Sequence, residues 1–292
     1  MDNSIEPRRR IRSLLLVFSL AVAMIGLLWG VVQTAFVSPL STAGYRDFSF
    51  DDVELGLELK VEAPSGEKPQ SKLWWHDGYW WGVLYNAETD HFHIYRLNWG
   101  DQEWVDSGIQ VDGRREDPFQ VPPKEPENVK VDVLWDEDEL KLYVVSHVFT
   151  KNGSRTSNSL NRGLLFRYTY DENLQTYTLD TADGFTVDGI QVNEHKSETL
   201  VLAKDSVGRM WTAFIARPQG SSQHQLIVTH SNGEGLQHDS VWNKDGISLP
   251  FTQTSTSSSD IATVFPINNQ GTPSIGVLWT NEVSNTVHLA FH

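Results

Sequence analysis

From about residue 70 onward, the sequence consists of short apolar or alternating runs separated by glycine, aspartate and asparagine. No segment there repeats every 3.6 residues over a helical length, so the runs predict β-strands. The strands recur in sets roughly 50 to 65 residues apart. The first three sets, 71–112, 130–188 and 197–250, each contain four strands, and the fourth, 258–292, contains three. This recurrence is the strongest constraint on the fold.

A four-stranded unit cannot bury both of its faces alone, and such units arranged around an axis form a β-propeller. We therefore predict an all-β propeller domain over residues 70–292, with about four blades and an incomplete last blade. A β-sandwich with coincidental spacing is the alternative, but the order of strand types repeats from set to set. The short fourth set has two interpretations. Either the ring is cut from about six blades, which we favour, or residues 46–61 supply the last strand and close four blades.

The amino-terminal part contains an uncharged run from Ser13 to Phe36, preceded by an arginine cluster in residues 7–12. Its 19 central residues would span about 28 Å as a helix, close to the thickness of a bilayer core. With the arginines on the cytoplasmic side, we predict a single-pass membrane protein with a cytoplasmic tail (1–12) and a signal-anchor helix (13–36). A tether with a first strand (37–69) follows, and the propeller is extracytoplasmic. A cleaved signal peptide is the alternative.

Composition excludes several classes of function. The chain has no cysteine, which rules out disulfides, a thiol nucleophile and cysteine-ligated metal sites. A net charge of −15 argues against a nucleic-acid partner, which would require a basic surface. No glycine-rich phosphate loop, nucleophile elbow or dinucleotide fingerprint is present.

The turn after the third strand of the third set carries a partial motif. Residues 231–238 read Ser-Asn-Gly-Glu-Gly-Leu-Gln-His. They resemble the Asp-box of sialidase-like (BNR-type) propellers, Ser/Thr-x-Asp-x-Gly-x-x-Trp, at Ser231 and Gly235. Gly233 replaces the Asp and His238 replaces the Trp. The resemblance implies the propeller fold over residues 70–292.

An active member of that family would carry three arginines for a substrate carboxylate, a tyrosine nucleophile with a glutamate partner, and an aspartic acid. Arg114 or Arg115 matches one such arginine by position after the first blade. The remaining catalytic set has no counterpart in register, so we name no catalytic residue.

A charged residue stands at the same place in the first strand of every set: Lys72, Asp132, Glu198 and Asp260. First strands line the central channel of a propeller, so these four positions should converge. We predict a ligand-binding channel at these residues together with Arg114 and Arg115. We expect no cofactor, although a calcium ion would suit the acidic mouth of the channel. The alternative is a solvated ring without a ligand, and we name no metal-ligating residue.

Two other groups of residues were candidates for binding. His91 and His93 share one face of a strand, but we expect them to be exposed rather than metal ligands. Tryptophans crowd the first set, and an exposed pair of them would stack on a sugar ring, although most should pack between blades.

The function that fits best is a membrane-anchored module that binds carbohydrate or a surface partner. A sialidase-like glycoside hydrolase and a non-catalytic protein-interaction scaffold are the alternatives.

Overall fold

The computed structural model describes residues 70–86, 88–89, 91–112, 129–150, 152–156, 162–232, 242–244, 256–269 and 272–292. All of them belong to the unit Phe50–His292. The predicted tail, membrane helix and tether lie outside the described residues, as do Arg114, Arg115 and most of the Asp-box-like motif.

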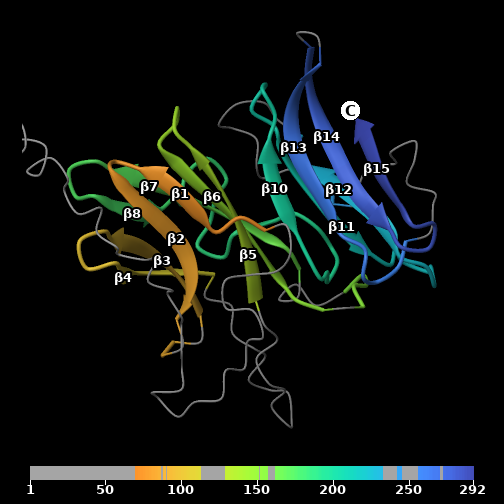
Figure 1. The fold of residues 1–292 in the computed structure, drawn as a ribbon, viewed down its shortest axis with the longest axis horizontal. Coiled ribbons are helices and arrows are strands. Elements are labelled where there is room, and N and C mark those ends of the chain that lie inside the picture. The colour runs from red at the N-terminus through yellow and green to blue at the C-terminus, as the bar shows by residue number, and fades with distance from the viewer. Residues whose placement is uncertain are drawn as a thin grey trace, which may run out of the picture. The chain divides into compact units, whose positions relative to one another are not determined.

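Sheet 1 contains four strands, each hydrogen-bonded to the next in sequence (Figure 1). They are β1 (Leu73–His76), β2 (Tyr79–Asn86), β3 (His91–Asn98) and β4 (Glu103–Val111). The β1–β2 turn consists of Asp77 and Gly78, whose φ angles are +50° and +77°. This left-handed pair matches the right-handed twist of the flanking strands and favours a two-residue hairpin.

The remaining strands form three more antiparallel sheets in sequence order. Sheet 2 contains β5 (Val129–Asp136), β6 (Lys141–Val148), β7 (Leu164–Asp171) and β8 (Thr176–Leu179), and the short β9 (Ile190–Gln191) pairs with β7. Sheet 3 contains β10 (Val201–Lys204), β11 (Met210–Ala216) and β12 (Gln225–His230). Sheet 4 contains β13 (Ala262–Asn269), β14 (Thr272–Asn281) and β15 (Thr286–Phe291).

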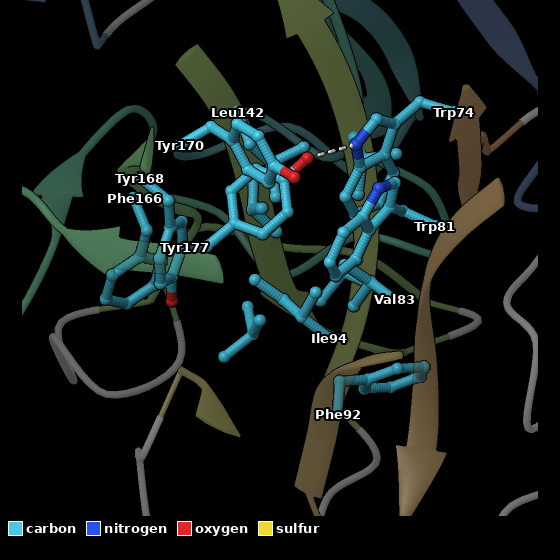
Figure 2. Packing of buried hydrophobic residues seen from close by; sticks show 14 of the residues in the cluster. Trp74, Trp81, Val83, Phe92, Ile94, Leu142, Phe166, Tyr168, Tyr170 and Tyr177 are labelled. Carbon is cyan, nitrogen blue, oxygen red and sulfur yellow. Dashed lines mark hydrogen bonds between the residues drawn. The ribbon is translucent and has the colours of Figure 1, made fainter. Parts of the chain in front are cut away.

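Consecutive sheets meet through their first strands, because β1 contacts β5, β5 contacts β10, and β10 contacts β13. They also pack face to face. One apolar cluster joins sheets 1 and 2, a second joins sheets 2 and 3, and a third joins sheets 3 and 4. Figure 2 shows the first cluster, with Trp74 and Trp81 of sheet 1 facing Tyr170 and Tyr177 of sheet 2. Alternating side chains of the middle strands therefore serve two different cores.

The prediction of an all-β body built from sequential antiparallel sheets is confirmed, and the described residues contain no helix. Consequently, the part of the chain that the structure describes offers no helix with the length and apolar character needed to cross a bilayer. The number of blades and the closure of a ring stay predictions.

Several strand boundaries differ from the prediction. The fourth strand of the second set was expected to reach residue 188 but ends at Leu179. The Asp180 N–H still donates to the Arg167 carbonyl at 2.8 Å, and beyond it Asp183, Gly184 and Gly189 adopt positive φ, which breaks the extended backbone. The first strands of the third and fourth sets begin at Val201 and Ala262 rather than at residues 197 and 258, so Glu198 and Asp260 precede their strands instead of lying in them.

Candidate functional site

Asp132 lies on β5 where the first three sheets meet. Its side chain is buried, Oδ1 accepts a hydrogen bond from the backbone N–H of Ser71, and Oδ2 accepts one from Leu202 at 2.7 Å. Ser71 precedes β1 and Leu202 lies on β10, so one carboxylate of sheet 2 holds the first strands of sheets 1 and 3. The Val133 N–H also donates to the Ser71 carbonyl, at 3.2 Å.

Lys72 is buried beside Asp132 and donates to the Val131 carbonyl. Burial raises the pKa of Asp132 to about 7, and the charge of Lys72 and the backbone donors offset only part of that effect. We call Ser71, Lys72, Asp132 and Leu202 the hub cluster. Its described contacts are structural, since they connect three sheets.

The other two predicted channel residues are also buried. Asp260 accepts hydrogen bonds from Ser257 N at 2.6 Å, Thr280 Oγ1 at 2.9 Å and Glu282 N at 2.8 Å, and so braces loops of its own sheet. Glu198 lies just before β10, the strand whose Leu202 binds Asp132. The structure thus brings Lys72 and Asp132 together, while the three described donors to Asp260 come from sheet 4. The ligand role of the four residues stays a prediction.

Within the described ranges, no group of three or more histidine and carboxylate side chains is placed to hold a metal ion. The calcium ion suggested by the acidic residues therefore stays a prediction as well.

A second cluster of side chains surrounds the turns that follow β1 and β5, with two members in the turns and three on β1, β5 and β7. We call its members, His76, Asp77, Trp135, Glu137 and Tyr170, the rim cluster. Glu137 accepts hydrogen bonds from Trp135 Nε1 at 2.5 Å and from His76 Nδ1 at 3.1 Å. Asp77 accepts one from the Tyr170 hydroxyl at 2.8 Å. Asp77 of sheet 1 is therefore held by Tyr170 of sheet 2, and Glu137 of sheet 2 is held partly by His76 of sheet 1.

Both rim carboxylates are exposed and remain ionised. The Tyr170 hydroxyl and then the Gln175 amide, which donates at 2.9 Å, lower the pKa of Asp77. The Trp135 indole contributes most to lowering the pKa of Glu137, and His76 adds to it. Burial raises the pKa of Tyr170, which keeps its phenol protonated as the donor.

Aromatic rings support the rim cluster from below. The His76 ring lies 4.5 Å, between centroids, from both Trp135 and Tyr170. Deeper in the same core, Trp74 Nε1 donates to the Tyr177 hydroxyl at 2.7 Å, the dashed line in Figure 2. Such interlocked edge-to-face rings leave few alternative rotamers, so the two carboxylates are held in place.

His93 differs from the prediction that it is exposed. It is buried, with Nδ1 2.8 Å from Asp106 Oδ2 and Nε2 2.9 Å from Thr89 Oγ1. Asn86 also donates to Asp106, at 2.8 Å. The contacts are explained by a β-bulge between Ile94 and Tyr95, since a bulge re-aims side chains.

The sequence reasoning missed the rim cluster. A usable signal was present, because the turn after the first strand is acidic in both of the first two sets: Asp77-Gly78 in one, and 136–139, Asp-Glu-Asp-Glu, in the other. Comparing equivalent turns, as was done for the first strands, would have paired Asp77 with Glu137.

Comparison with known proteins gives no family. No protein-family model matches the chain, and no curated protein matches it. Solved structures to which it is similar include polysaccharide lyase Uly1 (TM-score 0.35, 11% identity, 84% of this chain and 58% of the other). A second is a xylan beta-1,4-xylosidase from Bacillus halodurans C-125 (TM-score 0.34, 13% identity, 78% of this chain and 42% of the other). A third is an exo-1,5-alpha-L-arabinanase from a bovine ruminal metagenomic library (TM-score 0.25, 9% identity, 78% of this chain and 93% of the other).

The chain spans 58% and 42% of the first two of these structures. At such TM-scores and identities the likeness assigns neither a fold nor an activity to this chain.

Proposed function

We propose that the chain is a membrane-anchored β-propeller module that binds carbohydrate, and that the rim cluster is its sugar site. The propeller is supported by the order in which the sheets meet, first strand to first strand, and by their face-to-face packing. The sugar site is supported by the rim cluster's own chemistry.

The observation that carries the proposal is the fixed orientation of the Asp77 and Glu137 carboxylates beside aromatic rings. Both carboxylates are exposed, yet each is held by donors from aromatic side chains. The Tyr170 hydroxyl and the Gln175 amide both donate to Oδ2 of Asp77, and we assign Oδ1 to a ligand hydroxyl. Ionised carboxylates accept hydrogen bonds from adjacent sugar hydroxyls, and the half-buried Trp135 offers an apolar surface beside them.

The pKa pattern favours binding over hydrolysis. A glycoside hydrolase needs two nearby carboxyl groups, one of them with a raised pKa to act as the acid. Both rim carboxyl groups have lowered pKa values. Asp132 has a raised pKa but is buried at the hub and engaged by two backbone N–H groups.

The charge of the site favours neutral sugars. Two ionised carboxylates on a chain of net charge −15 would repel a sialic acid or a uronic acid. We therefore expect neutral, hydroxyl-rich oligosaccharides as ligands.

Calorimetry on the full chain in detergent tests the proposal with xylohexaose and cellohexaose as neutral probes and 3′-sialyllactose as the acidic one. We expect saturable binding of a neutral probe, weakened at least about tenfold by Asp77→Asn or Glu137→Gln because each amide replaces an acceptor oxygen with a donor. The matched control, Asp138→Asn, changes an exposed neighbour in the same turn and should leave affinity unchanged. The proposal would be contradicted if neither neutral probe bound. It would also be contradicted if the chain cleaved chromogenic glycosides and the same two variants lost that activity.

The membrane anchor is a separate part of the proposal and rests on the uncharged run in residues 13–36 and the arginines before it. When the full chain is expressed in cells and the membranes are extracted at alkaline pH, it should stay in the membrane pellet. A variant with two arginines inserted into the uncharged run should not. Complete release of the unaltered chain into the supernatant would exclude the anchor.

A further inference from the structure

Sheet 4 exposes one apolar face. Leu278 of β14 pairs with Leu289 of β15, and Val287 and Phe291 flank Leu289 on the same face. Leu289 is 50% exposed and Phe291 is 51% exposed. The opposite face, with Val277, Trp279 and Ala290, packs against sheet 3. We call the exposed side, Leu278, Val287, Leu289 and Phe291, the far face, and none of these four side chains is charged.

Sheet 1 exposes three apolar side chains on the face that points away from sheet 2, whereas Leu84 and Tyr95 on the same face are buried. The exposed ones are Leu73, Trp75 and Trp80, and Trp75 and Trp80 are cross-strand partners whose ring centroids are 5.6 Å apart. Trp75 is 53% exposed. The opposite face carries Trp74 and Trp81, which pack against sheet 2. We call the exposed side, Leu73, Trp75 and Trp80, the outer face.

These two faces are complementary by the rule that the rest of the chain follows. Sheet 1 packs one face on sheet 2, the other face of sheet 2 packs on sheet 3, and the other face of sheet 3 packs on sheet 4. Each sheet therefore has one face toward the preceding sheet in the chain and one toward the next. The far face is the successor-facing side of sheet 4, and the outer face is the predecessor-facing side of sheet 1. Since both remain exposed in one chain, they do not cover each other within it.

We propose that a second copy of this chain covers both faces, with the far face of each copy packed on the outer face of its partner. Exposed apolar faces of this kind mark interaction sites. None of the seven side chains that form the two faces is charged, and Asp106, which lies on the same side of sheet 1, is paired with His93. A head-to-tail contact of this type closes when two copies supply two identical junctions. If each sheet counts as one blade, the two chains together would supply twice the four sheets of one chain, which lies within the four to eight blades of known propellers.

The mass of the full chain in solution tests this contact. Light scattering that subtracts the detergent should give twice the 33.1 kDa of one chain. Trp75→Glu on the outer face and Leu289→Glu on the far face should each raise the dimer Kd about tenfold or more, because both junctions then bury a carboxylate. The control Leu174→Glu alters a residue that is 72% exposed, in the β7–β8 turn, and should remain dimeric.

Mixing the two variants gives the sharpest result. Trp75→Glu keeps an intact far face and Leu289→Glu keeps an intact outer face, so a dimer of one copy of each has one unaltered junction. An equimolar mixture should therefore dimerise more tightly than either variant alone. A dimer that joins two identical faces would instead survive one of the single substitutions. That outcome, no gain on mixing, or a monomeric unaltered chain at tens of micromolar would overturn the proposal.

Two measurements keep the result interpretable. Circular dichroism melts should show that each variant stays folded, with Val287→Glu and Leu73→Glu as replacements on the same faces if one does not. Sugar binding should persist in all of these variants, since the rim cluster is untouched, so failure of the dimer and failure of the sugar site are distinguishable.

Discussion

Replacing Asp132 with alanine is expected to lower the free energy of unfolding by about 3–5 kcal/mol. The substitution removes the acceptor for two backbone N–H groups, those of Ser71 and Leu202, and removes the carboxylate whose charge interacts with the buried Lys72. Each orphaned donor alone costs about 1–3 kcal/mol. Urea denaturation of the full chain, followed by tryptophan fluorescence, measures the loss. The exposed Asp138→Ala is the control and should change stability by less than about 0.5 kcal/mol.

The same carboxylate gives the stability an unusual pH dependence. Its folded pKa, about 7, lies above the unfolded value of 3.8, so its contribution is fully present below the unfolded pKa and is lost as the pH rises through about 7. Asparagine does not titrate. The difference in unfolding free energy between the native chain and Asp132→Asn should therefore be larger at pH 5 than at pH 8, and the reverse slope would show that the carboxylate is not buried at the hub.

Arg167→Met is expected to lower the unfolding free energy by a similar amount, about 3–5 kcal/mol. Arg167 is buried in β7, where Nε donates to Asp180 at 2.6 Å and Nη2 donates to Asp183 at 3.1 Å. Its guanidinium also lies 4.3 Å from the centroid of the Phe185 ring. Burial opposes the ionisation of Asp180, but hydrogen bonds from Thr169, Lys141 and Arg167 outweigh it and lower its pKa. Methionine would leave that carboxylate poorly compensated.

Urea denaturation of Arg167→Met, Arg167→Lys and the surface variant Arg155→Met separates the possible causes. The lysine variant should recover only part of the loss, because an ammonium cannot reproduce the two-armed contact with Asp180 and Asp183. Arg155→Met alters a partly exposed ion pair and should cost less than about 1 kcal/mol. Equal stability of the native chain and Arg167→Met would refute the role given to this network.

The strands were largely predictable because alternation and turn residues are local signals. The apolar run in residues 79–86 has the same bounds as β2, and Asp77 and Gly78 before it form the two-residue turn of a hairpin. The end of β8 at Leu179 was misplaced, because the residues that break the extended backbone, Asp183, Gly184 and Gly189 with their positive φ angles, were read as part of an alternating strand. The start of β10 was likewise misplaced, since residues 197–200 are buried but not paired in a ladder.

The candidate site was less accessible from sequence. Aligning the four first strands led to Asp132, whose contacts do span three sheets. The alignment could not show that Asp260 would accept hydrogen bonds from its own loops, because that depends on how residues 257 and 282 fold back. The rim cluster joins His76 to Glu137 and Asp77 to Tyr170, pairs separated by 61 and 93 residues. Contacts at such separations follow from sheet packing rather than from any local pattern.

The central claim, that a neutral sugar binds beside Glu137, is tested most directly at Trp135, whose indole N–H donates to that carboxylate. The full chain labelled with 5-fluorotryptophan should give a 19F spectrum in which Trp135 and Trp279 are assigned by Trp135→Phe and Trp279→Phe. On titration with xylohexaose or cellohexaose, whichever binds, we expect the Trp135 resonance to shift in step with saturation while the Trp279 resonance in sheet 4 stays fixed. Saturable binding that leaves Trp135 unmoved would place the sugar elsewhere and contradict the account.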